Sequence, residues 1–167
     1  MAVASAKVLE REAGISETDI RNGLRTMSWP GRMEMAMPGV VLDGAHNAAG
    51  IDELSRTLKR FEKKEKLYLL FTAVKEKDYV HMIEKICRGV EFEKILVTEV
   101  EGNRKLPAAR IGAVFRKYTD RPVEEYGSIR DAFCRGLELR KKEGILFCAG
   151  SLYLIGDIER IIKEEMQ

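Results

Sequence analysis

The chain has 167 residues, 45% of them hydrophobic and 34% charged, a balance typical of a soluble globular protein with one ordinary core. Lys plus Arg number 29 and Asp plus Glu 27, interleaved, for a net charge of +2, which gives no reason to propose a nucleic-acid partner. The apolar runs are too short to span a bilayer and no signal-peptide pattern opens the chain, so we expect a cytoplasmic protein without a membrane partner.

The first 28 residues predict helices but no convincing core element. Residues 2–13 are Ala-rich and predict a helix with a thin apolar face, which Gly14 would end. Ser16 then resembles an N-cap with acids in the first turn, for a short helix that runs to Leu24. We interpret residues 1–28 as connector helices from a larger part that precedes Met1.

A regular alternation of strands and helices begins at Trp29. The first element is a hairpin, because Pro38 presets φ and Gly39 tolerates positive φ, which is a type II turn signal. Residues 40–42 form its second, fully apolar strand. Methionines alternate along the first strand, and we expect all three to pack in the hairpin: Met33, Met35 and Met37.

The rest of the chain predicts βαβ units. Apolar residues recur at helical spacing in some segments and form short continuous runs in others. Helices are expected at 47–63, 79–86, 108–118, 128–139 and 152–164, and strands at 67–71, 94–98, 122–126 and 144–148. Strands that alternate with such helices predict right-handed crossovers, so we expect an α/β fold with a mostly parallel sheet and an antiparallel opening strand.

Several binding motifs are missing from the sequence. No glycine is followed by lysine, which excludes a G-x-x-x-x-G-K-[ST] phosphate loop, and no two glycines form G-x-G, which excludes the dinucleotide fingerprint. The cysteines form no C-x-x-C pair and only two histidines are present, so we expect free thiols and no metal site. If this chain handles a nucleotide, its own phosphate-cradling loop is absent.

Asp43 and His46 directly follow the apolar strand 40–42. They could recognise a sugar diol and a second ligand, or they could be a helix N-cap and a surface histidine, the commoner fate of an isolated D-x-x-H. Their place after a buried strand favours recognition, since Gly44 allows close backbone approach. Arg32 could be a solvated edge arginine or could grip a phosphate with its fork of donors.

Two further strand ends are expected at the same edge of the sheet. Lys75 and Lys77 follow the strand 67–71, as part of either a solvated loop or an anion site. Ser151 follows the strand 144–148, where it could cap a helix or present a hydroxyl beside helix N-terminal amides for a carboxylate. Three strand ends therefore offer convergent polar groups.

Three stretches carry a family resemblance: W-P-G-R-M-E followed by V-V-L-D-G-A-H-N, K-E-K-D-Y after an apolar strand, and A-G-S-L-Y-L-I-G-D-I-E-R near the end. In this order they resemble the folylpolyglutamate synthase and dihydrofolate synthase family, which belongs with the bacterial cell-wall Mur ligases. The resemblance extends from about Ile15 to the end of the chain. Glu76 departs from it, because a smaller or more variable residue is expected between the two lysines.

The resemblance implies an enzyme that activates a carboxylate with ATP as an acyl phosphate, which an amino group then attacks. It implies a covalently linked N-terminal P-loop domain that binds ATP, Mg²⁺ and the folate, and a Rossmann-like C-terminal domain, a three-layer sandwich, at 29–167. L-glutamate would be added to a reduced folate or to dihydropteroate. The present chain, expected to be monomeric, would be inactive alone because it holds only the second domain.

The resemblance also implies roles for single residues on the nucleotide side. Arg32 would contact the ATP phosphates across an interdomain cleft and take part in catalysis. Asp43 would hydrogen-bond the ribose or help to order the nucleotide. His46, a second catalytic candidate, and Asn47 would line the junction of ATP and the incoming glutamate.

On the glutamate side, Ser151 would bind a carboxylate near His46, with Lys75 as its cationic partner. Lys75 and Lys77 could exchange these roles. Two other functions stay open at this point. One is a non-catalytic α/β binding module for glutamate or a nucleotide, and the other is a small hydrolase, which is disfavoured because no nucleophile stands beside His46.

Overall fold

A six-stranded sheet forms the centre of the larger of two compact units, 31–167; the smaller unit is 1–30. The computed structural model describes residues 6, 8, 14–27, 29–140 and 144–165. The division falls between Pro30 and Gly31, whereas the expected boundary follows residue 28. The interpretation of the smaller unit as a connector stays a prediction.

The smaller unit contains helix α2, Glu17–Thr26. Its N-cap is Ser16, whose hydroxyl accepts a hydrogen bond from the Asp19 amide at 3.2 Å, while the Asp19 carboxylate accepts from the Ser16 amide at 3.0 Å. This reciprocal capping box confirms the predicted helix start. The helix expected over 2–13 lies mostly outside the described residues. Within that range only Ala6 and Val8 are described, and both are helical.

The strand order in the sheet is β1-β2-β6-β3-β4-β5. β1 pairs antiparallel with β2, and all other neighbours pair parallel, which confirms the predicted sheet with its antiparallel opening strand. The bounds lie close to those expected: β1 Glu34–Met37, β2 Val40–Leu42, β3 Leu67–Phe71, β4 Lys94–Thr98, β5 Val123–Tyr126 and β6 Ile145–Ala149.

The opening hairpin differs from its prediction in one respect. Gly39 has the positive φ of the predicted turn, +72°. Met33, however, precedes the strand and has φ +46°, and the pairing register shifts between Met35 and Met37. Met33 and Met37 therefore pack on different cores, while Met35 is 57% exposed. The expectation that all three methionines pack in the hairpin is wrong for Met35, because an irregularity in the pairing breaks the alternation.

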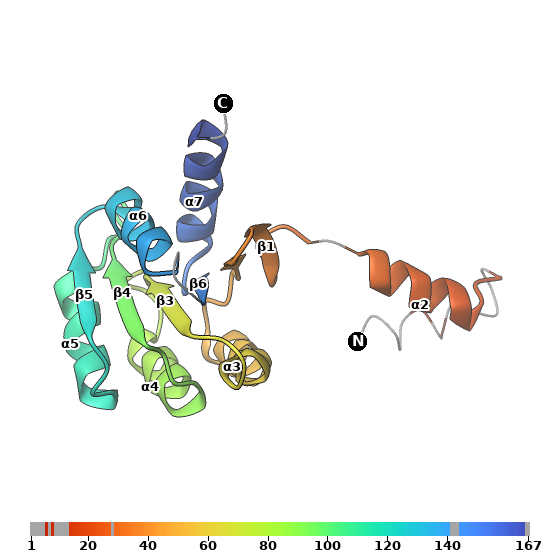
Figure 1. Cartoon of the computed structure of the whole chain (residues 1–167), viewed down its shortest axis with the longest axis horizontal. Helices are drawn as coiled ribbons and strands as arrows, with labels where there is room; N and C mark the ends of the chain where they lie inside the picture. Colours follow the sequence, from red (N-terminus) through yellow and green to blue (C-terminus); the bar gives the residue numbers. More distant parts are fainter. Residues whose placement is uncertain (1–5, 7, 9–13, 28, 141–143, 166–167) are drawn as a thin grey trace. The chain divides into compact units, whose positions relative to one another are not determined.

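Helices cover both faces of the sheet (Figure 1). One face packs against α3 (Ala48–Glu62), α4 (Tyr79–Gly89) and α5 (Ala108–Tyr118), and the other against α6 (Ile129–Arg140) and α7 (Leu152–Glu165). Successive strand residues serve opposite cores, as period-2 geometry requires: Leu69 contributes to the first core and Leu70 to the second. This three-layer α/β sandwich is the predicted fold. Among the described helices, none has the length and apolarity needed to cross a membrane.

The strand order creates a crevice at the carboxyl edge of the sheet. β6 lies between β2 and β3. The helices that follow β2 and β3 go to one face, whereas α7, which follows β6, goes to the other. Loops that leave neighbouring strands in opposite directions open a space between them, the usual ligand position in open α/β sheets.

Candidate functional site

The loop after β2 is tied to the segment before β1. The Asp43 carboxylate accepts hydrogen bonds from the amides of Met33 and Ala45, each at 2.9 Å. The Gly44 amide donates to the Gly31 carbonyl at 2.7 Å. The bond from the Met33 amide to Asp43 holds Met33 in its left-handed conformation, which costs a non-glycine residue about 1–2 kcal/mol. Asp43 therefore orders the segment that carries Arg32, and it is not a helix cap.

Arg32 lies across the backbone of Gly44. A Cβ atom at Gly44 would come within 2.7 Å of Arg32 Nη1 and 2.5 Å of Leu152 Cδ2, so a side chain there would displace the ends of both residues. Arg32 is exposed, and with the described residues it forms no hydrogen bond or ion pair. Its planar fork of donors is free for an anionic oxygen.

His46 and Asn47 use part of their polar groups for local structure. His46 Nδ1 lies 2.7 Å from the Gly44 carbonyl. Because a carbonyl only accepts, Nδ1 carries the proton, and Nε2 of the neutral ring can accept a hydrogen bond or a proton. Asn47 caps α3, since its Oδ1 accepts from the Gly50 amide at 2.8 Å. The cap in this motif is thus Asn47, and its side-chain NH₂ group keeps its donors.

Two cavities meet at His46. The first, which we name the Arg32 pocket, has a volume of about 230 Å³ and is lined by Arg32, Asp43, His46 and Asn47 among others. The second, the Ser151 pocket, has a volume of about 220 Å³. The residues that line it with polar groups are His46, Lys77, Arg104, Ser151 and Tyr153. The structure thus brings together five of the six residues assigned from the sequence.

Ser151 begins α7 from a buried position, with 3% of its surface exposed. Its Oγ accepts from the Tyr153 amide at 3.2 Å, so its own O–H can still donate to a ligand. Gly150 before it has φ +103°, and a Cβ there would lie 2.1 Å from the Thr72 carbonyl. Glycine at this position therefore lets the start of α7 lie against the end of β3.

The structure separates the two lysines of the loop after β3. Lys77 is half-buried and lines the Ser151 pocket, whereas Lys75 is exposed and lines neither of the two cavities. The Lys75 amide instead donates to the Arg104 carbonyl at 3.3 Å, which joins this loop to the loop after β4. Lys77 therefore occupies the place that the sequence assigned first to Lys75.

Two pocket residues were missed by the sequence analysis, Arg104 and Tyr153. Arg104 Nη1 donates to Tyr153 Oη at 3.0 Å, and the guanidinium carbon lies 5.5 Å from the centre of the Tyr153 ring. Nε of Arg104 donates to Glu76 Oε2 at 3.1 Å. The available signal was position alone, because Arg104 follows β4 and so reaches the same sheet edge as Lys77.

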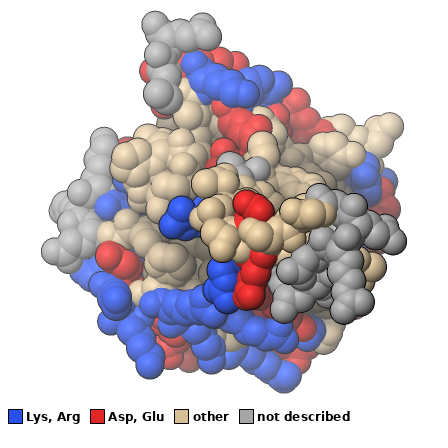
Figure 2. All heavy atoms as spheres, turned by 90° about the vertical axis from the view of Figure 1, so that its right-hand side faces the viewer, with Lys and Arg blue, Asp and Glu red and all other residues tan. Residues whose placement is uncertain are grey.

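Charge density alone would not have located these cavities. Lysine and arginine side chains also gather along the lower part of the face seen in Figure 2. The densest basic run in the sequence, 59–66, lies at the end of α3. Because α3 starts from the carboxyl edge at Asn47 and crosses back over the sheet, that run lies toward the opposite edge. Free donors beside a cavity are the more specific sign.

No cluster of three or more His, Cys, Asp or Glu side chains suited to a metal ion occurs within the described ranges. The assignment of Mg²⁺ to another domain stays a prediction. The cysteines are free thiols. Burial raises the pKa of Cys87 to about 12 and raises that of Cys148 as well, so neither is poised as a nucleophile.

Comparison with known proteins gives a consistent picture. Residues 31–152 match the protein family described as "Mur ligase, glutamate ligase domain". The dihydrofolate synthase/folylpolyglutamate synthase of Bacillus subtilis is 29% identical over 171 aligned positions, which cover 98% of this chain and 38% of that protein. The chain thus spans less than half the length of this relative.

Solved structures agree on the fold. E. coli FolC in complex with ADP matches with a TM-score of 0.79 and 20% identity, over 90% of this chain and 36% of FolC. A bifunctional folylpolyglutamate synthase/dihydrofolate synthase with Mn, AMPPNP and L-glutamate bound matches with a TM-score of 0.76 and 18% identity, over 89% of this chain and 35% of that one.

Proposed function

The chain belongs to the Mur ligase glutamate ligase domain family, and from this membership we propose that it is the C-terminal domain of an ATP-dependent ligase that adds L-glutamate to a folate. The observation that carries the proposal is the meeting of the Arg32 pocket and the Ser151 pocket at His46. One pocket offers a free guanidinium for phosphate, and the other offers cations and a hydroxyl for an amino acid. Two solved structures named above support both ligands, because one contains ADP and the other contains AMPPNP and L-glutamate.

On the nucleotide side, Arg32 would contact phosphate oxygens of ATP. Its guanidinium is free of partners among the described residues, and it suits phosphate geometry because its donors lie in one plane. Asp43 would act chiefly by positioning, since its oxygens already accept two backbone amides, and its remaining lone pairs could accept a ribose hydroxyl. ATP would arrive with Mg²⁺, which would be held mainly by a preceding P-loop domain and would neutralise phosphate charge.

On the amino-acid side, L-glutamate would enter the Ser151 pocket. Its two carboxylates would meet the side chains of Lys77 and Arg104, the Ser151 hydroxyl and the N-terminus of α7, where the helix dipole favours an anion. We assign the cationic role to Lys77 rather than Lys75, because Lys77 is the lysine that lines the cavity.

His46 would act where the two ligands meet. The amino group of glutamate attacks an acyl phosphate only as the neutral amine. Nε2 of His46 is free to accept a hydrogen bond or a proton from that group, because Nδ1 is committed to the Gly44 carbonyl. The attack displaces phosphate, whose developing negative charge Arg32 would stabilise in a cleft that excludes water.

The folate and the second wall of this cleft would belong to the preceding domain, so the chain alone should bind L-glutamate weakly and turn nothing over. Titration of the chain with L-glutamate, followed by NMR of backbone amides, tests the amino-acid side directly. We expect shifts around Ser151, Lys77 and Arg104. Shifts confined to another surface, or none at all, would contradict the proposal. Tight binding by the chain alone would favour a free-standing binding module.

A further inference from the structure

A carboxylate without a role in the proposed reaction lies beside the Ser151 pocket. Glu76 stands between the two lysines of V-K-E-K-D. It accepts a hydrogen bond from Arg104 Nε, while Arg104 Nη1 donates to Tyr153. Arg104 and Tyr153 line the cavity, and Glu76 does not. A pocket arginine is thus held from outside by a carboxylate of the same chain.

Arg104 still has donors for a ligand. Among the described residues, its Nη2 atom makes no hydrogen bond. Nε and Nη2 form one edge of the guanidinium, and such an edge suits the two oxygens of a single carboxylate. Glu76 takes only the Nε end of that edge. The side chains of Arg104 and Glu76 are 44% and 45% exposed, so water screens their attraction and the pair can exchange.

We propose that Glu76 is an internal competitor of the amino-acid substrate: it holds Arg104 while the pocket is empty, and a carboxylate of L-glutamate takes Arg104 from it. This inference rests on the proposed function, because it assumes that the Ser151 pocket receives glutamate. A ligand carboxylate that takes the Nε and Nη2 edge of Arg104 has to displace Glu76 from Nε, so the ion pair between Glu76 and Arg104 opposes ligand binding. The chain therefore binds glutamate less tightly than the cations of the pocket would allow.

The variant Glu76→Gln separates this role from simple positioning. Glutamine keeps an oxygen that can accept from Arg104 Nε but removes the negative charge. In the NMR titration with L-glutamate, we expect a Kd about 2- to 5-fold lower for E76Q than for the unchanged chain, the range set by exposed ion pairs. A residue that merely positions Arg104 would give an unchanged or higher Kd.

The exposed ion pair between Arg121 and Glu91 serves as a matched control. Arg121 Nη2 lies 3.0 Å from Glu91 Oε2, and the two side chains are 42% and 77% exposed. Neither residue lines the Ser151 pocket, so Glu91→Gln should leave the Kd unchanged. A double-mutant cycle adds a second test. With Arg104→Ala in place, E76Q should no longer alter the Kd, because the group for which the two carboxylates compete is gone.

The outcomes separate the competition from the proposed function. If shifts appear around Ser151 but E76Q binds L-glutamate no more tightly than the unchanged chain, the competition is overturned and the proposed function stands. The same conclusion follows if E76Q tightens binding equally without Arg104. If no glutamate-dependent shift appears in any variant, both ideas are contradicted.

Discussion

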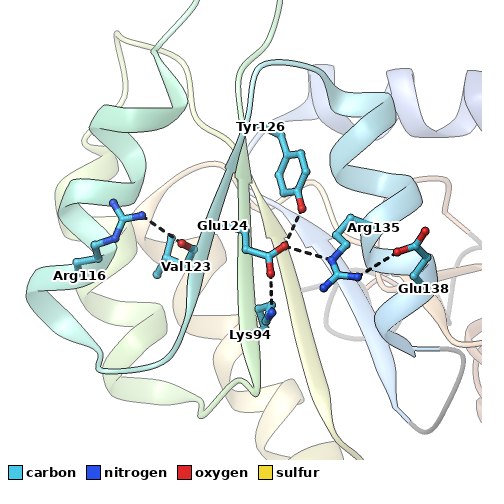
Figure 3. A network of polar contacts seen from close by, with 7 residues as sticks. All are labelled: Lys94, Arg116, Val123, Glu124, Tyr126, Arg135 and Glu138. Carbon is cyan, nitrogen blue, oxygen red and sulfur yellow. Dashed lines mark hydrogen bonds and ion pairs between the residues drawn. The ribbon is translucent and has the colours of Figure 1, made fainter.

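Arginine, glutamate and tyrosine side chains meet in two regions of the described chain. In one region the donors and acceptors are matched, and in the other some donors stay free for a ligand. In the first, the Glu124 network (Figure 3), the Glu124 carboxylate accepts from Lys94 Nζ at 2.5 Å, Tyr126 Oη at 2.6 Å and Arg135 Nε at 3.3 Å. In the second, at the Ser151 pocket, the Glu76 carboxylate accepts a hydrogen bond from Arg104 Nε at 3.1 Å.

Burial and the number of partners distinguish these regions. The Glu124 and Lys94 side chains come from the neighbouring strands β5 and β4, point toward Arg135 of α6 and are 29% and 23% exposed. Burial alone would raise the pKa of Glu124, but the hydrogen bonds from Lys94, Tyr126 and Arg135 lower it to about 2. Burial and the bond to Glu124 raise the pKa of Tyr126 to about 12. This network has its donors and acceptors matched and therefore serves the fold.

The pocket region, by contrast, keeps donors in excess. Arg32 has no partner in the described part of the chain, and Arg104 keeps Nη2 free. The same chemical groups thus stabilise the fold where they are matched and half-buried, and become available to an anionic ligand where they are exposed and unmatched. The predictions below test this contrast.

The largest effect is expected at Arg32. In the longer ligase that we propose, Arg32→Ala should lower turnover by about 10²–10³-fold, because a charge-stabilising donor is lost from the transition state. The urea midpoint should stay unchanged, since Arg32 is exposed. Arg135→Ala is the mirror control, which should lower the urea midpoint and leave turnover intact. If R32A is as active as the unchanged enzyme, the proposed contact of Arg32 with ATP in the cleft is contradicted.

A smaller effect is expected at Lys77. Lys77→Ala should raise the KM for L-glutamate about 10-fold, the loss expected for one charge-assisted hydrogen bond. Lys75→Ala, two positions away, should leave the KM unchanged because Lys75 does not line the cavity. Steady-state kinetics with glutamate as the varied substrate would distinguish them. The reverse result would return the cationic role to Lys75.

The smallest effect on function is expected at Glu124. Its folded pKa of about 2 lies below the ordinary value of 4.5, so its contribution to stability is present above pH 4.5 and is lost as the pH falls toward 2. Glu124→Gln should lower the free energy of unfolding at pH 7 by about 2 kcal/mol and flatten its decline below pH 4.5, with an unchanged KM for glutamate. Urea unfolding at pH 7 and pH 3 measures this. A difference that stays constant between those pH values would contradict the assignment.

Much of the fold was predictable from local patterns. The helices and parallel strands follow from apolar periodicity, and Asp43 and Ser151 could be placed because they lie within two residues of the end of a buried strand. The hairpin prediction missed the left-handed conformation of Met33, whose amide donates a hydrogen bond to the carboxylate of Asp43, distant in sequence. Local alternation carries no information about such a contact.

The Ser151 pocket was predictable only in part for the same reason. Two loops from different strands meet there, joined by the bond from the Lys75 amide to the Arg104 carbonyl. In this arrangement Lys77 lines the cavity and Arg104 reaches Tyr153. A sequence shows that both loops end at one edge, but it does not show which side chain of each loop turns inward.

The central claim, that this chain is one wall of a ligase site, is tested most directly by glutamate-dependent ADP formation with ATP and a folate substrate. The assay compares the 167-residue chain with a longer protein in which the proposed P-loop domain precedes it. We predict no turnover by the chain alone and clear turnover by the longer protein. Turnover by the chain alone, or none by the longer protein, would contradict the claim.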